Sequence, residues 1–495
     1  MLININKKFN SYAKNTNEFL SNGKDFLSFA NFFNEVQKQI VELKKLKKKQ
    51  NIIFVISDNI FRYWVNFISI TFSGSIFVPL AANTTKKQME DYFKVVEPDF
   101  IIAENSFFCK FKNLKKYQLT FFLTRKKIWA NARIDFSIKK NVAILFTSGT
   151  TDNPKGVRLS FESLFGNAIN TIKKIPIKSF DNLFVNIPIT FTSAISHFLV
   201  SFLNKNKIIF DETKIIGSDL VRKLNSNNVT CFGGSPIQIK WILDNINNLN
   251  SKVSWLMSSG DKLSAEVIKD FKSKRPALLI VSVYGLTEVG GRCCIIYGDE
   301  IINNEDTVGK PISGLKYLIC DNNGNEVNRE KLGEIVIEGK FLFSGYINNK
   351  TLTKQKLSKN KFYTGDYGIK TQNDMLVVLG RKDQIVKISG QRVDLNYVAN
   401  CIAKTKEIVD AVVIPLRHNR IGIIPFAIIV KEKGVKVYMG LLRKNLINIL
   451  KPIEMPQDFY LVESIPRTGS GKVDFKIIRK NLEQFIKKNS QLDFI

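Results

Sequence analysis

The chain contains little histidine, few acidic residues and no CxxC cysteine pair. Of its 495 residues only His197 and His418 are histidines, which excludes any mechanism that depends on several imidazoles. The six cysteines are scattered, an arrangement that argues against a disulfide framework or a zinc site. The cysteine pattern therefore indicates a reducing compartment, and we expect a cytoplasmic protein.

Aspartate and glutamate are scarce beside the basic residues, 44 against 74, which gives a formal net charge of +30. Nucleic acid, an anionic membrane or an acidic protein could each be the partner of so basic a chain. Asparagine, isoleucine and phenylalanine are also abundant, whereas alanine, glycine and proline are few. This joint bias favours compositional drift across all positions, so no nucleic-acid partner is expected. A basic binding surface is the alternative.

Long apolar segments suited to a membrane are also lacking. Residues 63–85 carry no charge and are numerous enough to raise the question of a transmembrane span. Polar residues and a proline interrupt this stretch, and we predict a buried helix over 60–72, a turn at Gly74 and a strand over 75–80. Lysines near the N-terminus interrupt any apolar signal region, so neither a transmembrane segment nor a signal peptide is expected.

Strand and helix patterns alternate through the first part of the chain. The length predicts two or three domains rather than one core. Buried-strand patterns such as 51–56 and 98–102 alternate with helical segments, which is typical of a parallel α/β sheet. Strand patterns within 229–236, 255–260 and 279–288 each end in a loop of small residues. A doubly wound sheet binds its ligand at such loops.

The pattern changes near residue 308 to short alternating strands separated by glycine turns. This change predicts a small β-barrel over about 308–382. Residues 383–495 return to mixed strands and helices and are numerous enough for a domain of their own. The predicted fold is therefore α/β: an N-terminal region over 1–382, with doubly wound sheets plus the barrel, and a smaller α+β C-terminal domain.

The most informative stretch is a loop of small residues that follows a strand pattern over 142–146. Hydroxyls and backbone N–H groups over Thr147–Thr151 can surround a polyphosphate without obstruction by Cβ atoms. Asp152-Asn153-Pro154 is turn chemistry, and Lys155-Gly156 places a cation beside a residue that permits close backbone approach. The spacing is not that of a Walker loop. The alternative is a surface loop that is simply rich in serine, threonine and glycine.

Five further motifs follow this loop in order. They are Tyr284-Gly-Leu-Thr-Glu288, Gly333-Glu334 through Gly345-Tyr346, Tyr363-Thr-Gly-Asp366, Gly380-Arg-Lys-Asp383 with Val386–Val393, and Pro466-Arg-Thr-Gly-Ser-Gly-Lys472. With these motifs the chain resembles the acyl-adenylate-forming superfamily of acyl-CoA synthetases, peptide-synthetase adenylation domains and firefly-type luciferases. The resemblance covers nearly the whole chain, and its weight comes from the order of the set rather than from any single motif.

The resemblance implies ATP and Mg²⁺ as cofactors. A carboxylate must attack the α-phosphorus of ATP, anion against anion, so catalysis depends on charge neutralisation and positioning. The phosphate loop would contribute Thr147, Ser148, Gly149, Thr150, Thr151 and Lys155 to the β and γ phosphates. Glu288, with Thr151, would bind Mg²⁺, a hard cation suited to oxygen ligands.

The same resemblance implies roles for the later motifs. Thr287 would bond the α-phosphate, and Lys472 would bridge the substrate carboxylate and that phosphate during adenylation. The nucleoside would be held by Tyr284 and Gly285 at adenine, by Gly260 and Asp261 beside it, and by Asp366 with Arg381 at the ribose. The C-terminal domain, 383–495, would be mobile, with Asp383 as its hinge.

The acyl pocket departs from the pattern of common family members. Phe191 stands where many acyl-CoA synthetases have histidine, and Phe191, Gly233 and Ser259 are the candidate pocket residues. Members that activate amino acids place an aspartate near Thr192, and its absence here disfavours an α-amino acid. Residues 396–398, Asn-Tyr-Val, replace the usual Gly-Glu-Ile.

The sequence thus predicts an ATP-dependent carboxylic acid ligase that forms an acyl-adenylate, releases pyrophosphate and passes the acyl group to CoA. One alternative acceptor is the phosphopantetheine arm of an acyl carrier protein. A catalytically degenerate basic binding protein is an alternative of another class. The intact Lys155, Glu288, Asp366 and Lys472 argue against the degenerate protein.

Overall fold

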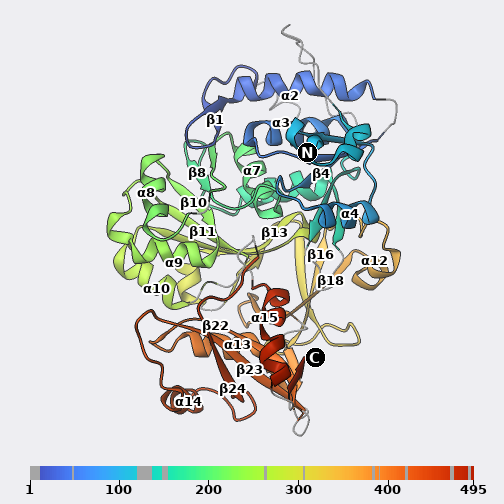
Figure 1. The fold of residues 1–495 in the computed structure, drawn as a ribbon. Helices are drawn as coiled ribbons and strands as arrows, with labels where there is room; N and C mark the ends of the chain where they lie inside the picture. Colours follow the sequence, from blue (N-terminus) through green and yellow to red (C-terminus); the bar gives the residue numbers. More distant parts are fainter. Residues whose placement is uncertain are drawn as a thin grey trace. The chain divides into compact units, whose positions relative to one another are not determined.

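The computed structural model describes residues 12–46, 50–119, 137–147, 154–213, 215–260, 263, 265–304, 307–381, 385–388, 391–418, 422–468, 473–488 and 492–494. Two compact units share the chain (Figure 1). The first comprises Met1–Tyr317 and Ile337–Tyr363, and the second Leu318–Val336 and Thr364–Ile495. The chain therefore passes between the units more than once.

The smaller sheet of the first unit has five strands. Its order is β5 (Phe100–Ala103), β3 (Ile52–Ile56), β4 (Ile76–Leu80), β6 (Asn141–Thr147) and β7 (Lys155–Ser160). All strands are parallel except β7, which returns antiparallel to β6. The helices in this region are α3 (Ile60–Ser73), α4 (Lys86–Val95) and α5 (Asn105–Lys110). The parallel α/β alternation predicted from the sequence is confirmed.

The larger sheet of the same unit has nine strands. Its order is β14 (Lys310–Pro311), β13 (Gly291–Tyr297), β12 (Leu279–Leu286), β11 (Trp255–Ser259), β10 (Cys231–Gly234), β8 (Asn182–Val185), β9 (Lys207–Phe210), β1 (Glu18–Ser21) and β2 (Phe26–Ser28). Its helices are α2 (Phe29–Lys44), α6 (Asn167–Ile172), α7 (Thr192–Asn204), α8 (Ser218–Ser226), α9 (Pro236–Asp244), α10 (Ala265–Lys274) and α11 (Asp299–Asn303). Strands β8 to β12 are mutually parallel, and β13 runs antiparallel to β12.

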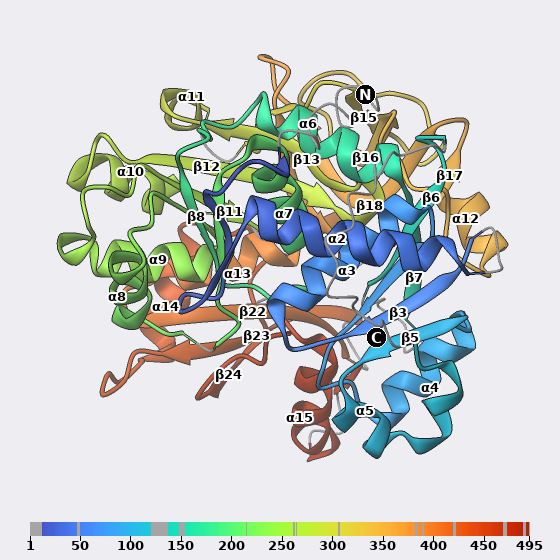
Figure 2. The same cartoon turned by 90° about the horizontal axis from the view of Figure 1, so that it is seen from above.

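The winding of the larger sheet changes direction between β8 and β10. The chain moves from β8 through α7 to β9, then returns through α8 to β10 on the other side of β8. Because parallel crossovers are right-handed, α7 covers one face and α8 to α10 cover the other (Figure 2). The carboxyl ends of β10, β11 and β12 lie in register at one edge of the sheet. The small-residue loops predicted to meet at a ligand edge therefore do meet there.

An aromatic core joins the helices of the two sheets in this unit. Trp64 of α3 is fully buried and stacks on Phe198 of α7, with ring centroids 4.1 Å apart and planes inclined by 3°. It also stacks on Phe210 at 4.9 Å. Aromatic side chains bury large apolar areas, so this core supplies much of the unit's cohesion.

The charge-free stretch over residues 63–85 forms a helix, a turn and a strand, as predicted. Helix α3 ends at Gly74, whose φ of 79° is the left-handed conformation that glycine adopts most readily. Strand β4 then begins at Ile76 and is buried along its whole length. No helix among the described residues is both long and apolar enough to cross a membrane.

A curled, half-barrel sheet forms where the sequence predicted a small β-barrel. Its strands are β15 (Leu315–Cys320), β16 (Gly333–Gly339), β18 (Lys361–Lys370) and β17 (Leu357–Ser358), with β19 (Leu376–Arg381) paired to β18. Helix α12 (Lys350–Lys356) precedes β17. Strands β15, β16 and β18 each have residues in both units.

The rest of the second unit is a hairpin and a four-stranded sheet with helices. The hairpin is β20 (Ile385–Ile388) with β21 (Gln391–Asp394), and the sheet runs β24 (Asp458–Val462), β23 (Gly422–Lys431), β22 (Ile408–His418) and β25 (Leu492–Phe494). The helices are α13 (Leu395–Ala403), α14 (Met439–Ile447) and α15 (Phe475–Lys488). Alternate residues of β22 enter two cores: Val413 packs with α13 and α14, whereas Val412 and Ile414 pack with α15. The α+β character predicted for this region is confirmed, while the boundary at 382/383 remains a prediction.

Several turns place a side chain where glycine is usual. Seven described non-glycine residues have positive φ: Lys205, Asn228, Glu330, Asn348, Lys359, Asn360 and Asp374. Five of the seven are lysine or asparagine, the polar residues in which the chain is enriched. This distribution fits compositional drift, because such a bias acts on turn positions as on any others.

We predict that Trp64→Ala lowers the free energy of unfolding by about 3–5 kcal/mol, because it leaves a large cavity beside Phe198. Trp64→Phe should cost less than half as much, since it keeps a ring and removes an indole N–H that has no described hydrogen-bond partner. Denaturant unfolding monitors both variants. Phe180→Ala, at a side chain that is 79% exposed, is the control. Equal losses for the two Trp64 variants would contradict the stacking role.

Candidate active site

The two ends of the predicted phosphate loop belong to two paired strands. Strands β6 and β7 pair antiparallel, with Thr147 directly opposite Lys155. Ser148, Gly149, Thr150 and Thr151 lie outside the described residues. The structure thus places the loop's two end residues side by side, as a closed loop requires.

Gly156 has a packing role next to this loop. A Cβ atom there would lie 2.6 Å from Cγ2 of Ile347, and the Ile347 N–H donates to the Gly156 carbonyl at 2.8 Å. The segment that approaches this glycine is the chain at Ile347, next to Tyr346, and the predicted approach of a phosphate stays a prediction. The hairpin and the Gly345-Tyr346 motif are linked in this way.

The Tyr284–Glu288 motif lies at the carboxyl end of β12 and in the short 3₁₀ helix η4 (Thr287–Val289). The Glu288 carboxylate accepts a hydrogen bond from the Tyr346 hydroxyl at 2.9 Å, and the Glu288 carbonyl accepts from Phe343 N at 2.7 Å. The Thr287 hydroxyl lies 2.8 Å from that of Thr192, at the start of α7. Two motif side chains are thus fixed by partners far away in the sequence.

The turn after the motif is anchored by Asn167, which is fully buried in α6. Its amide nitrogen donates to the carbonyls of Val289 and Arg292 at 2.8 and 2.7 Å, and its oxygen accepts from Arg292 N at 3.2 Å. Gly290 caps η4 with φ 75°, and a Cβ there would lie 2.0 Å from the Ser163 carbonyl oxygen. Only glycine can occupy this position without displacing the backbone of the neighbouring helix.

The candidate acyl-pocket residues Gly233 and Ser259 lie at the carboxyl ends of β10 and β11, and Phe191 is the N-cap of α7. Gly233 contacts the imidazole of His197, since a Cβ atom there would lie 2.3 Å from Cε1. Gly260, next to Ser259, has φ 97°. These residues belong to the edge where β10, β11 and β12 end, whereas Asp261 lies outside the described part of the chain.

The structure pairs His197 with Arg292, a contact that no sequence pattern predicted. Arg292 Nη2 lies 2.9 Å from His197 Nε2, and the two side chains are 3% and 2% exposed. Burial, together with the Arg292 charge, holds the pKa of His197 well below its usual value, and burial lowers the pKa of Arg292 to about 10. At neutral pH the pair is therefore a neutral imidazole that accepts from a guanidinium cation.

Asp366 belongs to the second unit and is paired there with Arg381. The two residues face each other across β18 and β19, with Arg381 Nε 3.0 Å from the Asp366 carboxylate. Asp366 is buried, and its N–H donates to the Thr364 hydroxyl at 2.9 Å. Arg381 also donates to the Thr364 carbonyl at 3.3 Å. The proximity of Arg381 to Asp366, implied by the resemblance, is present in the structure.

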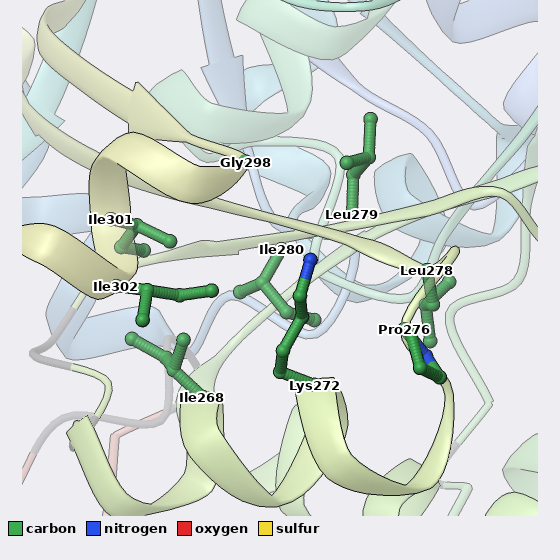
Figure 3. Close-up of a pocket in the computed structure, with 9 residues that line it drawn as sticks. All are labelled: Ile268, Lys272, Pro276, Leu278, Leu279, Ile280, Gly298, Ile301 and Ile302. Carbon is green, nitrogen blue, oxygen red and sulfur yellow. The ribbon is translucent and has the colours of Figure 1, made fainter.

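Lys472 and Asp383 lie outside the described residues. A small cavity of about 20 Å³ lies between α10, α11 and the start of β12. Figure 3 shows the residues that line it. Its lining is mainly apolar, with Ile268, Ile280 and Ile301 among the contributing side chains. The cavity adjoins the amino end of β12, whereas the motif follows the carboxyl end, so it is separate from the candidate site.

Comparison with known protein families identifies the family to which the chain belongs. A family model for AMP-binding enzymes matches residues 11–347. The chain belongs to the AMP-binding enzyme family. A second family model, for the C-terminal domain of AMP-binding enzymes, matches residues 397–472. The protein is accordingly an AMP-forming ligase of the adenylating type.

Individual relatives of this AMP-binding enzyme are distant in sequence. D-alanine–D-alanyl carrier protein ligase of Streptococcus pneumoniae is 24% identical over 436 residues, which are 83% of this chain and 84% of the relative. ATP-bound MatB from Rhodopseudomonas palustris has a TM-score of 0.85 at 20% identity, over 98% of this chain and 100% of that one. O-succinylbenzoate coenzyme A synthetase (MenE) from Bacillus subtilis, in complex with ATP and magnesium ion, has a TM-score of 0.81 at 18% identity, over 94% and 97%.

We predict that Tyr346→Phe raises the Mg²⁺ concentration for half-maximal pyrophosphate release about tenfold. The variant keeps the ring packing and removes the hydroxyl that orients the Glu288 carboxylate, and a hydrogen bond to a charged group contributes about 1.5–3 kcal/mol. Initial rates are measured over a series of Mg²⁺ concentrations.

The matched control for this prediction is Tyr12→Phe. It removes a buried hydroxyl that donates to the Phe202 carbonyl, ten residues along α7 from Thr192. Tyr12→Phe should lower stability without changing the Mg²⁺ dependence. An unaltered Mg²⁺ dependence in a folded Tyr346→Phe protein would rule out the orienting role.

Proposed function

We propose that the enzyme activates a carboxylic acid as its acyl-adenylate and then transfers the acyl group to the thiol of CoA. In the first step a carboxylate oxygen bonds to the α-phosphorus of ATP, and the bond to pyrophosphate breaks. In the second step the thiolate bonds to the acyl carbon, AMP leaves, and the thiol proton passes to solvent. The observation that carries the proposal is the fixed geometry of Thr287 and Glu288 at the edge where β10, β11 and β12 end.

The residues of the first unit act by neutralising and positioning charge. Lys155, opposite Thr147 at the base of the hairpin, supplies a cation for the phosphates. Thr287, whose hydroxyl is bonded to that of Thr192, presents an oxygen for the α-phosphate. Because the Thr287 hydroxyl is held by a hydrogen bond before ATP binds, it needs little reorganisation when negative charge develops.

Glu288 is the residue that would hold Mg²⁺. In proteins Mg²⁺ is commonly bound through one or two carboxylates together with substrate phosphates, and the Tyr346 hydroxyl fixes such a carboxylate here. Among the described residues no group of three or more histidine, cysteine or acidic side chains could form a separate metal centre. When bound, Mg²⁺ neutralises phosphate charge. Thr151, the second candidate ligand, stays a prediction.

Asp366 is proposed to bind the ribose hydroxyls. Its ion pair with Arg381 and the backbone bond to Thr364 hold the carboxylate in one orientation. A buried carboxylate in a fixed position accepts hydrogen bonds from vicinal hydroxyls at little entropic cost. Tyr284, half-buried at the end of β12, is the candidate for stacking on adenine.

The acceptor has a second candidate, the phosphopantetheine arm of a carrier protein. The streptococcal relatives are named as carrier protein ligases, whereas MenE is named as a coenzyme A synthetase. Carrier proteins are typically acidic, and a net charge of +30 would attract one over long distances. Tyr397, within the residues that replace Gly-Glu-Ile, is 45% exposed. These features support testing both acceptors.

We predict that Lys472→Ala abolishes acyl-AMP formation and largely spares thioester formation from supplied acyl-AMP. The lysine charge is needed only while the α-phosphate is attacked. Pyrophosphate release and thioester formation are assayed separately on the same preparation. Equal loss of both half-reactions would show that Lys472 does not have this role.

The acceptor is tested by comparing kcat/KM for CoA and for a carrier protein from the same organism. We expect CoA to be the better acceptor at both low and physiological salt. The Debye length falls from ~30 Å at 0.01 M to ~8 Å near 0.15 M salt, so a steered carrier protein would lose kcat/KM over this range. A higher kcat/KM for the carrier protein would identify the second candidate as the acceptor.

A further inference from the structure

Arg292 is a buried cation that has no acidic partner in the part of the chain that the structure describes. Its side chain is 3% exposed, and no described carboxylate lies within ion-pair distance of it. The guanidinium bonds to His197 through Nη2, while its Nε has no hydrogen-bond partner among the described residues. An arginine in this state is unusual, because burying a charge is costly unless it is paired.

His197 does not compensate this charge. The imidazole is 2% exposed, and its bond to Arg292 requires Nε2 to accept. A neutral ring supplies a dipole but no negative charge, so the described residues leave the positive charge of Arg292 uncompensated. The desolvation cost is offset only when an anion joins the pair.

The position of the pair is next to the candidate acyl pocket. Arg292 on β13 is paired in register with Gly285 of the nucleotide motif. His197 lies against Gly233 of β10, on the helix whose first residue, Thr192, bonds to Thr287. The nucleotide motif, the candidate pocket residue Gly233 and the buried cation Arg292 therefore lie on neighbouring elements of the same sheet and on helix α7.

The Arg292 side chain has no part in the hydrogen bonds that anchor this turn. Asn167 contacts only the Arg292 backbone N–H and carbonyl. Those bonds use only backbone atoms, so any residue except proline could make them at this position. The stability of the turn therefore does not require the positive charge of Arg292. A ligand that carries a negative charge could bind to it.

We propose that Arg292 recognises a carboxylate at the far end of the acyl substrate, so that the enzyme activates a dicarboxylic acid. This inference rests on the proposed acid ligation and narrows its substrate class. One carboxylate becomes the acyl-adenylate, and the other accepts from the guanidinium, whose planar donors suit carboxylate geometry. A substrate ammonium group would be repelled at this position, which agrees with the absence of an aspartate near Thr192.

The test compares matched substrates in the wild-type enzyme and in Arg292→Met. Linear dicarboxylic acids from propanedioic to octanedioic acid are each paired with the monocarboxylic acid of equal chain length, and pyrophosphate release gives kcat/KM. For the wild type, kcat/KM should be at least about 100-fold higher for the best dicarboxylic acid than for the monocarboxylic acid of equal chain length. Arg292→Met should lose at least about 100-fold on the diacid, as for truncating one partner of a buried charge pair, and keep or raise activity on the monoacid.

A second variant, Arg292→Gln, separates charge from packing. Glutamine can still donate to His197 Nε2 but carries no charge, so it should lose the diacid preference and retain the monoacid activity. The assignment would be overturned if the wild type preferred the monocarboxylic acids. It would also be overturned if either folded variant lost kcat/KM equally on both substrates. If folded wild-type enzyme releases pyrophosphate with no acid of any class, the proposed function fails as well. Activity confined to monoacids overturns the present inference alone.

Discussion

The three hydrogen bonds from Asn167 to the backbone of Val289 and Arg292 hold the turn on which the candidate site depends. They fix the point where the parallel strand β12 gives way to the antiparallel strand β13. Loss of this amide would remove three hydrogen bonds to buried backbone groups, at about 1–3 kcal/mol each. Glu288 and Thr287 lie immediately before the turn. Their positions therefore depend on a residue that never contacts a substrate.

The supports around this turn come from distant parts of the sequence. Tyr346 orients the Glu288 carboxylate, Thr192 meets Thr287, and Gly290 lets the chain pass close to the Ser163 carbonyl. The chemistry is assigned to groups on the strand ends, while the rigidity comes from two helices and a returning segment. This separation is common in α/β enzymes, where a stable scaffold presents variable loops.

Local patterns in the sequence predicted most of the fold, whereas the nucleotide motifs were identified from the resemblance to a family. The helix, glycine turn and strand over residues 60–80 were readable because amphipathicity and turn chemistry act over a few residues. The loops after β10, β11 and β12 were readable from their small side chains. The pairing of His197 with Arg292 was not, because it joins residues 95 positions apart. The role of Asn167 was hidden for the same reason, since an asparagine within a helix has no local signature.

The turns with positive φ at non-glycine residues lower the thermal stability of the protein. A side chain in the left-handed conformation costs roughly 1–2 kcal/mol relative to glycine, less for asparagine. Lys205, at the end of α7, and Lys359 are two of these positions. Lysine at such positions places strain in separate loops of the molecule. The protein holds an unused reserve of stability outside its active site, which mutation could recover without touching the chemistry.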